Sequence, residues 1–345
     1  MKFSVGLPML KNDDFIEKII ACREGIYEVY FSFGGYPSGR GSVRGAESEP
    51  VWAAQSRQLD ELSRLSEAGI SLNLLLNAGC FGADALSRAF FVGIGETLDR
   101  LASRYPIRSV TTTSPLIGKF IHENFTGIEV RASVNLGIGS TAAMDYTAEY
   151  YDGYYLKREL NRQLDKIHEL REWCDKNRKG LFMLANSGCL NDCSARAFHD
   201  NMVAHETEIA KMDNAYAFTG VCREYLKSPE KRISLIRDMN YVRPEDMGLY
   251  EGLFTAAKLA TRVNPRPERI LDAYLGKRYV GAVTDLLEPD NGVSLLPSIV
   301  DNSRFPADFG ERVAVCDKRC GECGYCGEVL EGALVRLAAD EDMYI

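Results

Sequence analysis

The sequence predicts an α/β protein built as a (β/α)8, or TIM-type, barrel with two additions. Eight short apolar runs alternate with amphipathic helical segments along most of the chain, which is the pattern of repeated βα units and a parallel sheet. Eight such strands favour a closed barrel over an open doubly wound sheet. The additions are a long insertion after the seventh strand and a cysteine-rich C-terminal extension.

Each predicted strand is a short run of apolar and β-branched residues bounded by polar residues, Gly or Pro. Leucines at helical spacing, such as Leu59, Leu62 and Leu65 before Gly69, predict the intervening helices. In chain order we expect strands at Phe3–Pro8, Glu28–Phe33, Leu72–Asn77, Ser109–Thr112, Glu129–Ser133, Gly153–Lys157, Gly180–Ala185 and Phe254–Thr261.

The alternation stops between the seventh and eighth strands, where residues 186–252 intervene. Long loops on the carboxyl-end face of a barrel are usually functional. We therefore expect a barrel domain over residues 1–288 that carries a cluster-binding insertion at 186–252. A C-terminal extension with the cysteine-rich motif follows at 289–345.

Composition excludes several classes of protein. The 345 residues are 46% hydrophobic and 26% charged, and no apolar run is long enough to span a membrane. The N-terminal apolar run is broken by Gly6 and Pro8 and lacks a cleavage site, so we predict a cytoplasmic protein. Lys and Arg (41) are outnumbered by Asp and Glu (49), which disfavours RNA as the main partner without excluding it. Neither G-x-G-x-x-G nor a P-loop occurs.

Four of the ten cysteines form one short motif near the C-terminus. Cys316, Cys320, Cys323 and Cys326 follow a C-x3-C-x2-C-x2-C pattern with glycines beside the sulfurs. Bacterial ferredoxins use the same short gaps in the opposite order to hold an iron–sulfur cluster. Structural zinc usually takes two knuckles separated by a longer loop. We expect an iron–sulfur cluster here, with zinc as the alternative.

A second group of cysteines follows predicted strands. Cys189 and Cys193 come directly after the strand at 180–185, and Cys222 lies further along the insertion. Cys80 follows the strand at 72–77 in the same way, although a small buried hydrophobe is the alternative role for this residue. Two strands therefore deliver thiols from their carboxyl ends. Cys22 and Cys174, both in helical segments, are expected in the core.

Polar residues at strand ends are the candidates for catalysis, because barrel enzymes carry their chemistry there. Asn77, Arg158 and Asn186 occupy such positions, and His199 follows Cys193 by six residues. The guanidinium of Arg158 suits a carboxylate or phosphate, with a surface ion pair as the alternative. His199 is a candidate acid or substrate ligand, or else a hydrogen-bonded structural histidine.

Six segments in combination resemble the U32 family, the collagenase-like peptidases. They are Tyr27–Tyr30, Leu76–Cys80, Leu156–Leu160, Asn186–His199, Val242–Asp246 and Cys320–Cys326. The resemblance implies a barrel with an oxygen-sensitive [4Fe-4S] cluster held by four cysteines. Transferred to this sequence, it implies Cys189, Cys193 and Cys222 as ligands, with Cys80 as the fourth. Family members support oxygen-independent hydroxylation of the ubiquinone ring or of RNA bases, whereas others carry only the peptidase label.

We therefore expect an iron–sulfur enzyme that hydroxylates or otherwise tailors a small molecule, peptide or RNA base without oxygen. It would carry two [4Fe-4S] clusters and use a protein partner or electron donor. A metal- or Cys-dependent peptidase is one alternative, although the sequence contains neither H-E-x-x-H nor G-x-S-x-G. The other alternative is a noncatalytic iron–sulfur subunit of a larger complex.

Overall fold

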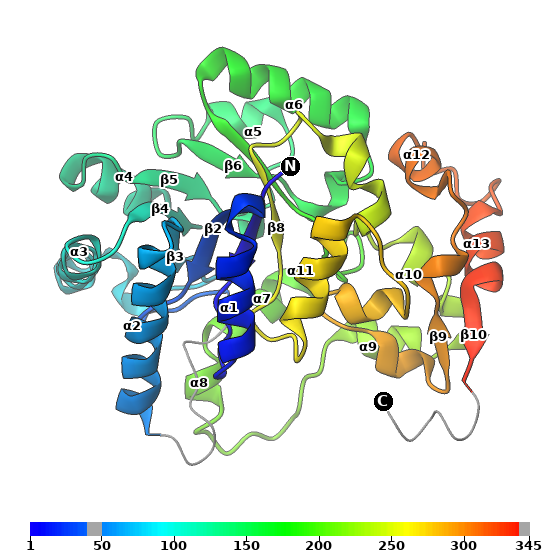
Figure 1. Cartoon of the computed structure of the whole chain (residues 1–345), viewed down its shortest axis with the longest axis horizontal. Helices are drawn as coiled ribbons and strands as arrows, with labels where there is room; N and C mark the ends of the chain where they lie inside the picture. Colours follow the sequence, from blue (N-terminus) through cyan, green and yellow to red (C-terminus); the bar gives the residue numbers. More distant parts are fainter. Residues whose placement is uncertain (40–49, 338–345) are drawn as a thin grey trace.

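The computed structural model describes residues 1–39 and 50–337, and its centre is a closed barrel of eight parallel strands (Figure 1). The strands pair in chain order, and β1 closes the barrel by pairing with β8. The predicted (β/α)8 fold is thus confirmed. The strands are β1 (Phe3–Gly6), β2 (Ile26–Phe31), β3 (Leu72–Leu76), β4 (Ile107–Thr112), β5 (Glu129–Ala132), β6 (Gly153–Tyr155), β7 (Gly180–Leu184) and β8 (Ala256–Leu259).

Seven of the eight strands end one or two residues before their predicted runs do, and the hydrogen bonds after β6 and β8 show why. The run at Gly153–Lys157 gives a β6 that stops at Tyr155, because the Lys157 amide donates to the Ile138 carbonyl (2.8 Å) instead of continuing the ladder. Likewise β8 stops at Leu259, and the hydroxyl of Thr261 bonds the backbone of Gly6 on the first strand. The residues after both strands therefore turn into the loops at the mouth of the barrel.

Helices cover the outside of the barrel, and some of them begin at a side chain that caps their first turn. The side chains of Asn12, Ser87 and Ser114 each accept a hydrogen bond from an amide in the first turn that follows. The barrel helices are α1 (Asp13–Ala21), α2 (Val51–Glu67), α3 (Arg88–Ala102), α4 (Pro115–Asn124), α5 (Thr141–Asp145), α6 (Leu164–Asn177) and α11 (Pro267–Gly276). Cys174 on α6 is fully buried, as predicted, whereas Cys22 is only half-buried because it caps the end of α1 and is not on its buried face.

Nine short 3-10 helices lie within the described residues. They are η1 (Arg23–Gly25), η2 (Ala83–Leu86), η3 (Val134–Leu136), η4 (Arg158–Leu160), η5 (Pro229–Lys231), η6 (Pro244–Tyr250), η7 (Val283–Leu286), η8 (Gly292–Leu295) and η9 (Asn302–Arg304). None of the helices that the structure describes combines the length and the hydropathy needed to span a bilayer.

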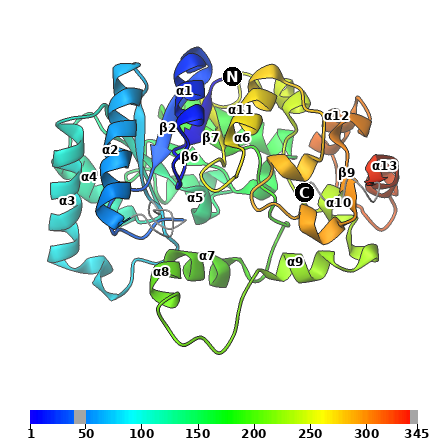
Figure 2. The same ribbon diagram turned by 60° about the horizontal axis from the view of Figure 1, so that its bottom comes forward.

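The insertion and the C-terminal extension pack on each other beside the barrel. The insertion contains α7 (Arg196–Ala204), α8 (Glu206–Ile209), α9 (Val221–Leu226) and α10 (Ser234–Arg237). The extension contains β9 (Ser298–Val300), α12 (Phe309–Ala314), α13 (Tyr325–Ala333) and β10 (Leu334–Arg336), with β9 and β10 antiparallel. Leu235, Ile236 and Met239 of the insertion share a second hydrophobic core with Val300, Phe309 and Val329 of the extension. In Figure 2, α7, α8 and α9 lie along the side of the molecule that faces forward and down.

A buried ion pair lies inside the barrel. Arg131 of β5 donates from Nη1 to both carboxylate oxygens of Glu28 on β2 (2.6 and 2.7 Å), and neither side chain is exposed. The Glu28 carboxylate also accepts from Ser4, Asn73 and Ser109. Burial opposes the charged guanidinium most strongly, but Glu28, Tyr155 and Glu129 together outweigh it and raise the pKa of Arg131. The pair connects β2 to β5 across the barrel interior, although the buried Nε of Arg131 has no hydrogen-bond partner among the described residues.

Candidate active site

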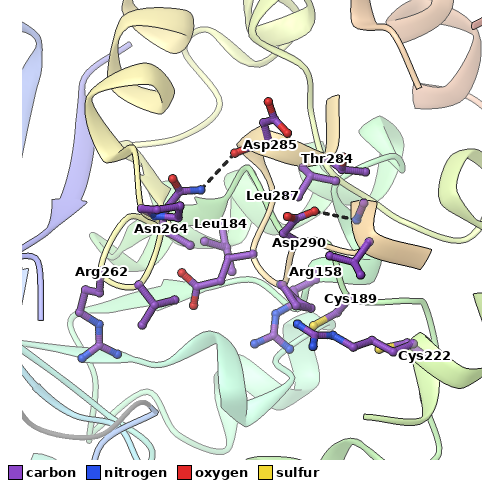
Figure 3. Close-up of a pocket in the computed structure, with 18 of the residues that line it drawn as sticks. Arg158, Leu184, Cys189, Cys222, Arg262, Asn264, Thr284, Asp285, Leu287 and Asp290 are labelled. Carbon is purple, nitrogen blue, oxygen red and sulfur yellow. Dashed lines mark hydrogen bonds between the residues drawn. The ribbon is translucent and has the colours of Figure 1, made fainter. Parts of the chain in front are cut away.

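A cavity of about 990 Å³ opens at the carboxyl ends of the barrel strands (Figure 3). Tyr30, Leu184 and Lys258 line it from the strands, whereas His199 and Val203 line it from α7 of the insertion. The loop that carries Thr284 to Glu288 forms part of the wall. The cavity thus occupies the face where barrel enzymes hold their substrates, and the insertion forms one side of it.

Two arginines contribute positive charge to the cavity. Arg158 begins η4, and its Nη2 donates to the Asn135 side chain at 3.0 Å. Arg262 follows β8, and its Nη1 lies 3.4 Å from the Ser32 hydroxyl. Both side chains line the cavity, and Figure 3 shows them on different sides of it. A guanidinium fork is suited to binding a carboxylate or phosphate, so the cavity offers two positions for an anionic group.

Asn77 is positioned where a strand-end candidate was expected. It follows β3, lines the cavity and is almost fully buried. Its Oδ1 accepts from the Gly39 amide (3.0 Å), and its Nδ2 lies 3.5 Å from the Ser133 hydroxyl. The side chain therefore joins the loop after β2 to the loop after β5, and it presents a fixed amide to the cavity.

Lys258 of β8 is a buried amine in the cavity wall. Its side chain is 9% exposed, and Nζ lies 3.9 Å from the ring centroid of Tyr30 and 5.5 Å from that of Tyr155. Such ring contacts favour the ammonium form by about 0.5–2 kcal/mol. Burial, followed by the positive charge of Arg262, acts the other way and lowers the pKa of Lys258 to about 7. A far larger fraction of this amine is therefore neutral at pH 7 than of an ordinary lysine.

Three cysteines of the insertion lie near one another at the cavity. Cys189 and Cys222 line the cavity, and all three thiols, including that of Cys193, are half-buried. Burial, with the nearby thiols of Cys189 and Cys193, raises the pKa of Cys222. The predicted grouping of Cys189, Cys193 and Cys222 therefore corresponds to a real neighbourhood, even though 33 positions separate Cys189 from Cys222.

His199 lies beside this group of thiols. The position that a β-carbon on Gly220 would take is 3.5 Å from the Cys222 sulfur and 3.8 Å from Cε1 of His199. Both distances are ordinary van der Waals contacts, whereas the φ of +101° at Gly220 is one that L side chains rarely adopt and favours glycine in this turn. The His199 ring also packs edge-on against Phe218 with centroids 5.4 Å apart. Its position at the cavity agrees with that expected of a candidate acid or substrate ligand.

The chemistry of these donors fits an iron–sulfur cluster, because such clusters are held by Cys thiolates. The thiols are not already gathered around one point. Within residues 1–39 and 50–337, no three or more His, Cys, Asp or Glu side chains are arranged as a finished metal site. Cluster ligation by Cys189, Cys193 and Cys222 thus remains a prediction that requires these side chains to turn toward one centre.

Cys80 is placed next to the insertion by a close backbone approach. A β-carbon on Gly79 would lie 2.8 Å from Oδ1 of Asn201 and 3.4 Å from the backbone carbonyl carbon of Asp200, so this loop lies directly against α7. The Cys80 sulfur is half-buried and accepts from the Gly82 amide at 3.4 Å. This loop therefore reaches the helix that carries His199, while ligation by Cys80 remains a prediction.

The four cysteines of the extension form a second neighbourhood. They lie on the loop before α13 and in its first turn, where Cys320 and Cys323 are exposed and Cys316 and Cys326 are half-buried. Burial and the thiols of the other three raise the pKa of Cys326, against the opposing charge of Arg162. A loop with four thiols near one another suits a cluster or zinc, and occupancy by either one remains a prediction.

Asn186 differs from the other candidates because its side chain is occupied by backbone. Its Nδ2 donates to the carbonyls of Ala260 and Leu286 (3.0 and 2.8 Å), and its Oδ1 accepts from the Ala260 amide at 2.7 Å. It is fully buried and is not among the residues that line the cavity. Asn186 thus ties the end of β7 to the segments after β8 and η7.

We expect Asn186→Ala to lower the free energy of unfolding by about 1–3 kcal/mol, because it leaves buried backbone groups without partners. Urea denaturation followed by circular dichroism measures this change. Asn124→Ala on α4 is the matched control, since that exposed amide bonds only the Phe120 carbonyl among the described residues. Equal stability of the two variants would contradict the bridging role.

Lys258 was absent from the candidates that the sequence suggested, although a signal for it exists. It stands alone in the run Phe-Thr-Ala-Ala-Lys-Leu-Ala-Thr, which the sequence predicts to be a buried strand. Lysine is almost never fully buried unless it is paired, so a lone lysine inside such a strand indicates a special environment. When only apolar periodicity is considered, Lys258 is merely an interruption of the apolar pattern.

Comparison with known proteins identifies relatives of the whole barrel. No protein-family model matches the chain. A protein of Methanocaldococcus jannaschii named "Uncharacterized protease MJ1657" is 26% identical over 313 residues, covering 89% of both chains. The solved structure of the U32 peptidase Mk0906 superposes with a TM-score of 0.53 at 15% identity, covering 75% of this chain and 91% of that one. At this identity, the structural likeness shows a shared fold.

Proposed function

We propose that the chain is an iron–sulfur-dependent enzyme. This proposal proceeds from membership of the U32 family, which the relative and the solved structure described above support. The carrying observation is the neighbourhood of Cys189, Cys193 and Cys222 at the wall of the barrel-mouth cavity. Its reaction would be oxygen-independent hydroxylation or a related tailoring of a substrate in that cavity. A cytoplasmic location and dependence on anaerobic conditions belong to the same proposal.

The residues that would hold the barrel cluster are Cys189, Cys193 and Cys222, with Cys80 as the fourth. When bound, such a cluster supplies electron transfer and, if only three thiolates ligate it, an iron that acts as a Lewis acid. The chain's own residues have the remaining tasks. Arg158 and Arg262 bind the anionic part of the substrate, Asn77 orients it, and His199 is positioned to exchange a proton.

The four cysteines of the extension would hold the second cluster. The extension that carries these cysteines packs directly on the insertion through a shared hydrophobic core. This packing supports a role in passing electrons from a donor protein toward the barrel site, and the exposed Cys320 and Cys323 mark the side on which a donor would dock. Zinc in this motif is the alternative, and it would make the extension purely structural.

We expect anaerobically purified protein to contain about eight irons and eight sulfides per chain, the content of two [4Fe-4S] clusters. Cys222→Ser should remove the barrel cluster, and the double change Cys320→Ser and Cys323→Ser the other one. Each variant would therefore retain about four irons. Iron, sulfide and zinc analysis with EPR spectroscopy measures this.

Cys22→Ser is the matched control, because this half-buried cysteine ends α1 far along the chain from both groups. Its iron content should equal that of the unmodified chain. Cys80→Ser tests the fourth ligand separately. Iron and sulfide at background in the unmodified protein would overturn the proposal, and zinc without sulfide would restrict the tail to a structural site.

A cysteine-dependent peptidase is the second candidate function. The relative named as a protease and the structure named as a peptidase favour it. So does the approach of Cys222 and His199 to Gly220, since a thiol next to an imidazole is a usual nucleophile pair. Cleavage of a peptide library by iron-free protein, lost in Cys222→Ser and retained in Cys22→Ser, would select this function over the first.

A further inference from the structure

The cavity contains a buried amine that the proposed cluster chemistry does not use. Lys258 is about nine-tenths buried, lines the cavity, and lies on a rigid barrel strand. Within residues 1–39 and 50–337, its Nζ has ring contacts with Tyr30 and Tyr155 but no hydrogen-bond partner. An amine that lines a cavity without a side-chain or backbone partner is available to a ligand in that cavity.

The charged groups around Lys258 come from four parts of the barrel. Arg262 follows the same strand, and Arg158 approaches from η4. Glu28 faces the lysine from β2 inside the barrel, and Glu288 faces it from the loop after η7. Glu28 is already bonded to Arg131 and three polar side chains. The two guanidiniums line the same cavity as the amine and are close enough to lower its pKa, so a ligand in the cavity can meet all three groups.

We propose that Lys258 is a nucleophilic residue that forms an imine with an aldehyde or ketone bearing a carboxylate or phosphate, which Arg158 and Arg262 bind. Lysines become nucleophilic at neutral pH when they are desolvated or lie beside another cation, and both conditions hold here. Such a compound fits the site because its carbonyl group can react with the amine and its anionic group can bind the guanidinium forks.

The reaction balances without a further reagent. The nitrogen lone pair attacks the carbonyl carbon, and the carbonyl electron pair takes up a proton to give a carbinolamine. Loss of its hydroxyl group and of a nitrogen proton as water then gives the imine. This proposal goes beyond the iron–sulfur function and does not depend on it, since none of the three residues is a proposed cluster ligand.

Trapping with a reductant tests the proposal on the full chain. Protein without iron is incubated at pH 7 with glyoxylate and sodium cyanoborohydride, which converts an imine to a stable carboxymethyl-lysine. Peptide mass spectrometry then follows each lysine. We expect Lys258 to react at least tenfold faster than Lys119 and Lys11, whose side chains are 58% and 66% exposed. At pH 7 only about 0.04% of ordinary lysines carry a free amine.

The dependence on pH and on the anionic group gives two further readouts. The rate at Lys258 should level off above pH 8, whereas the rates at the exposed lysines continue to rise. Arg158→Gln and Arg262→Gln should lower the preference of Lys258 for glyoxylate over acetaldehyde at least fivefold, and Arg108→Gln should not. Glycolaldehyde phosphate in place of glyoxylate distinguishes a phosphate from a carboxylate substrate.

Lys258→Arg confirms the assignment of the modified peptide. The rates measured at each lysine of the chain without substitutions do not depend on whether this variant folds. A rate at Lys258 no faster than at Lys119, or one that follows the pH dependence of an ordinary lysine, would overturn the proposal. An unchanged aldehyde preference in both arginine variants would overturn the anion-binding part. Iron analysis reports on the cluster separately, so the two proposals fail independently.

Discussion

Replacing Arg131 with methionine is expected to lower the free energy of unfolding by about 3–5 kcal/mol, the usual effect of leaving a buried charge without its partner. Glu28 would lose two hydrogen bonds, at 2.6 and 2.7 Å, while remaining fully buried in the barrel. Ser4, Asn73 and Ser109 would still donate to it, but they carry no charge. Urea denaturation followed by circular dichroism measures the loss.

Arg108→Met is the matched control for this substitution. Arg108 also pairs with an acidic residue of β5, Glu129, but at 3.6 Å and with 45% of its side chain exposed. An exposed pair of this kind is worth at most about 1 kcal/mol. Adding Glu28→Gln to Arg131→Met should recover part of the stability, because the unpaired charge is then gone. Equal losses in the two single variants would contradict this explanation.

Replacing Lys258 with methionine should have the opposite effect and stabilise the protein at neutral pH. The folded-state pKa of Lys258 is about 7, below the ordinary lysine value near 10.4. The unfolded chain therefore binds more protons between these two values, so the unmodified protein becomes more stable as the pH rises through that range. The slope is at most about 1.4 kcal/mol per pH unit.

We expect Lys258→Met to raise the free energy of unfolding by about 2–4 kcal/mol at pH 7, with the gain disappearing near pH 10. Lys119→Met on α4 is the control, because this 58% exposed residue should change stability by less than about 1 kcal/mol at either pH. A loss of stability in Lys258→Met at pH 7 would show that the ring contacts, and not burial, dominate. A gain would show that the chain tolerates an unfavourable residue at its cavity, as functional sites often require.

The barrel could be predicted from sequence because its strands are short apolar runs that recur with helices between them. Each of the eight expected runs contains most of a strand, and errors are confined to the ends, as at Lys157, whose amide bonds a neighbouring loop. Hydrogen bonds of this kind depend on which loops meet at the barrel mouth. A single sequence does not carry that information.

The candidate site was predictable only in part. Strand-end position correctly brought Asn77 and Arg158 to the cavity, because the carboxyl ends of parallel strands meet at one face. The same rule failed to distinguish Asn186, whose amide is used to bond backbone. The proximity of Cys222 to Cys189 was suggested by family resemblance and not by spacing. Lys258 was missed because the residue pattern of a strand shows only its apolar periodicity. It does not show which face of the strand lines a cavity.

The second hydrophobic core determines which parts of the protein unfold together in local unfolding. It is assembled from residues 226–241 and 283–333, which are separated in the chain by the eighth barrel strand. Amide hydrogen exchange should therefore find two cooperative units, in which the insertion and the extension lose protection together while the barrel strands remain protected. A transient release of the extension uncovers the apolar side of the insertion. The lifetime of the cavity wall thus depends on the second hydrophobic core, which reaches the cavity at Leu287 while its other members do not line the cavity.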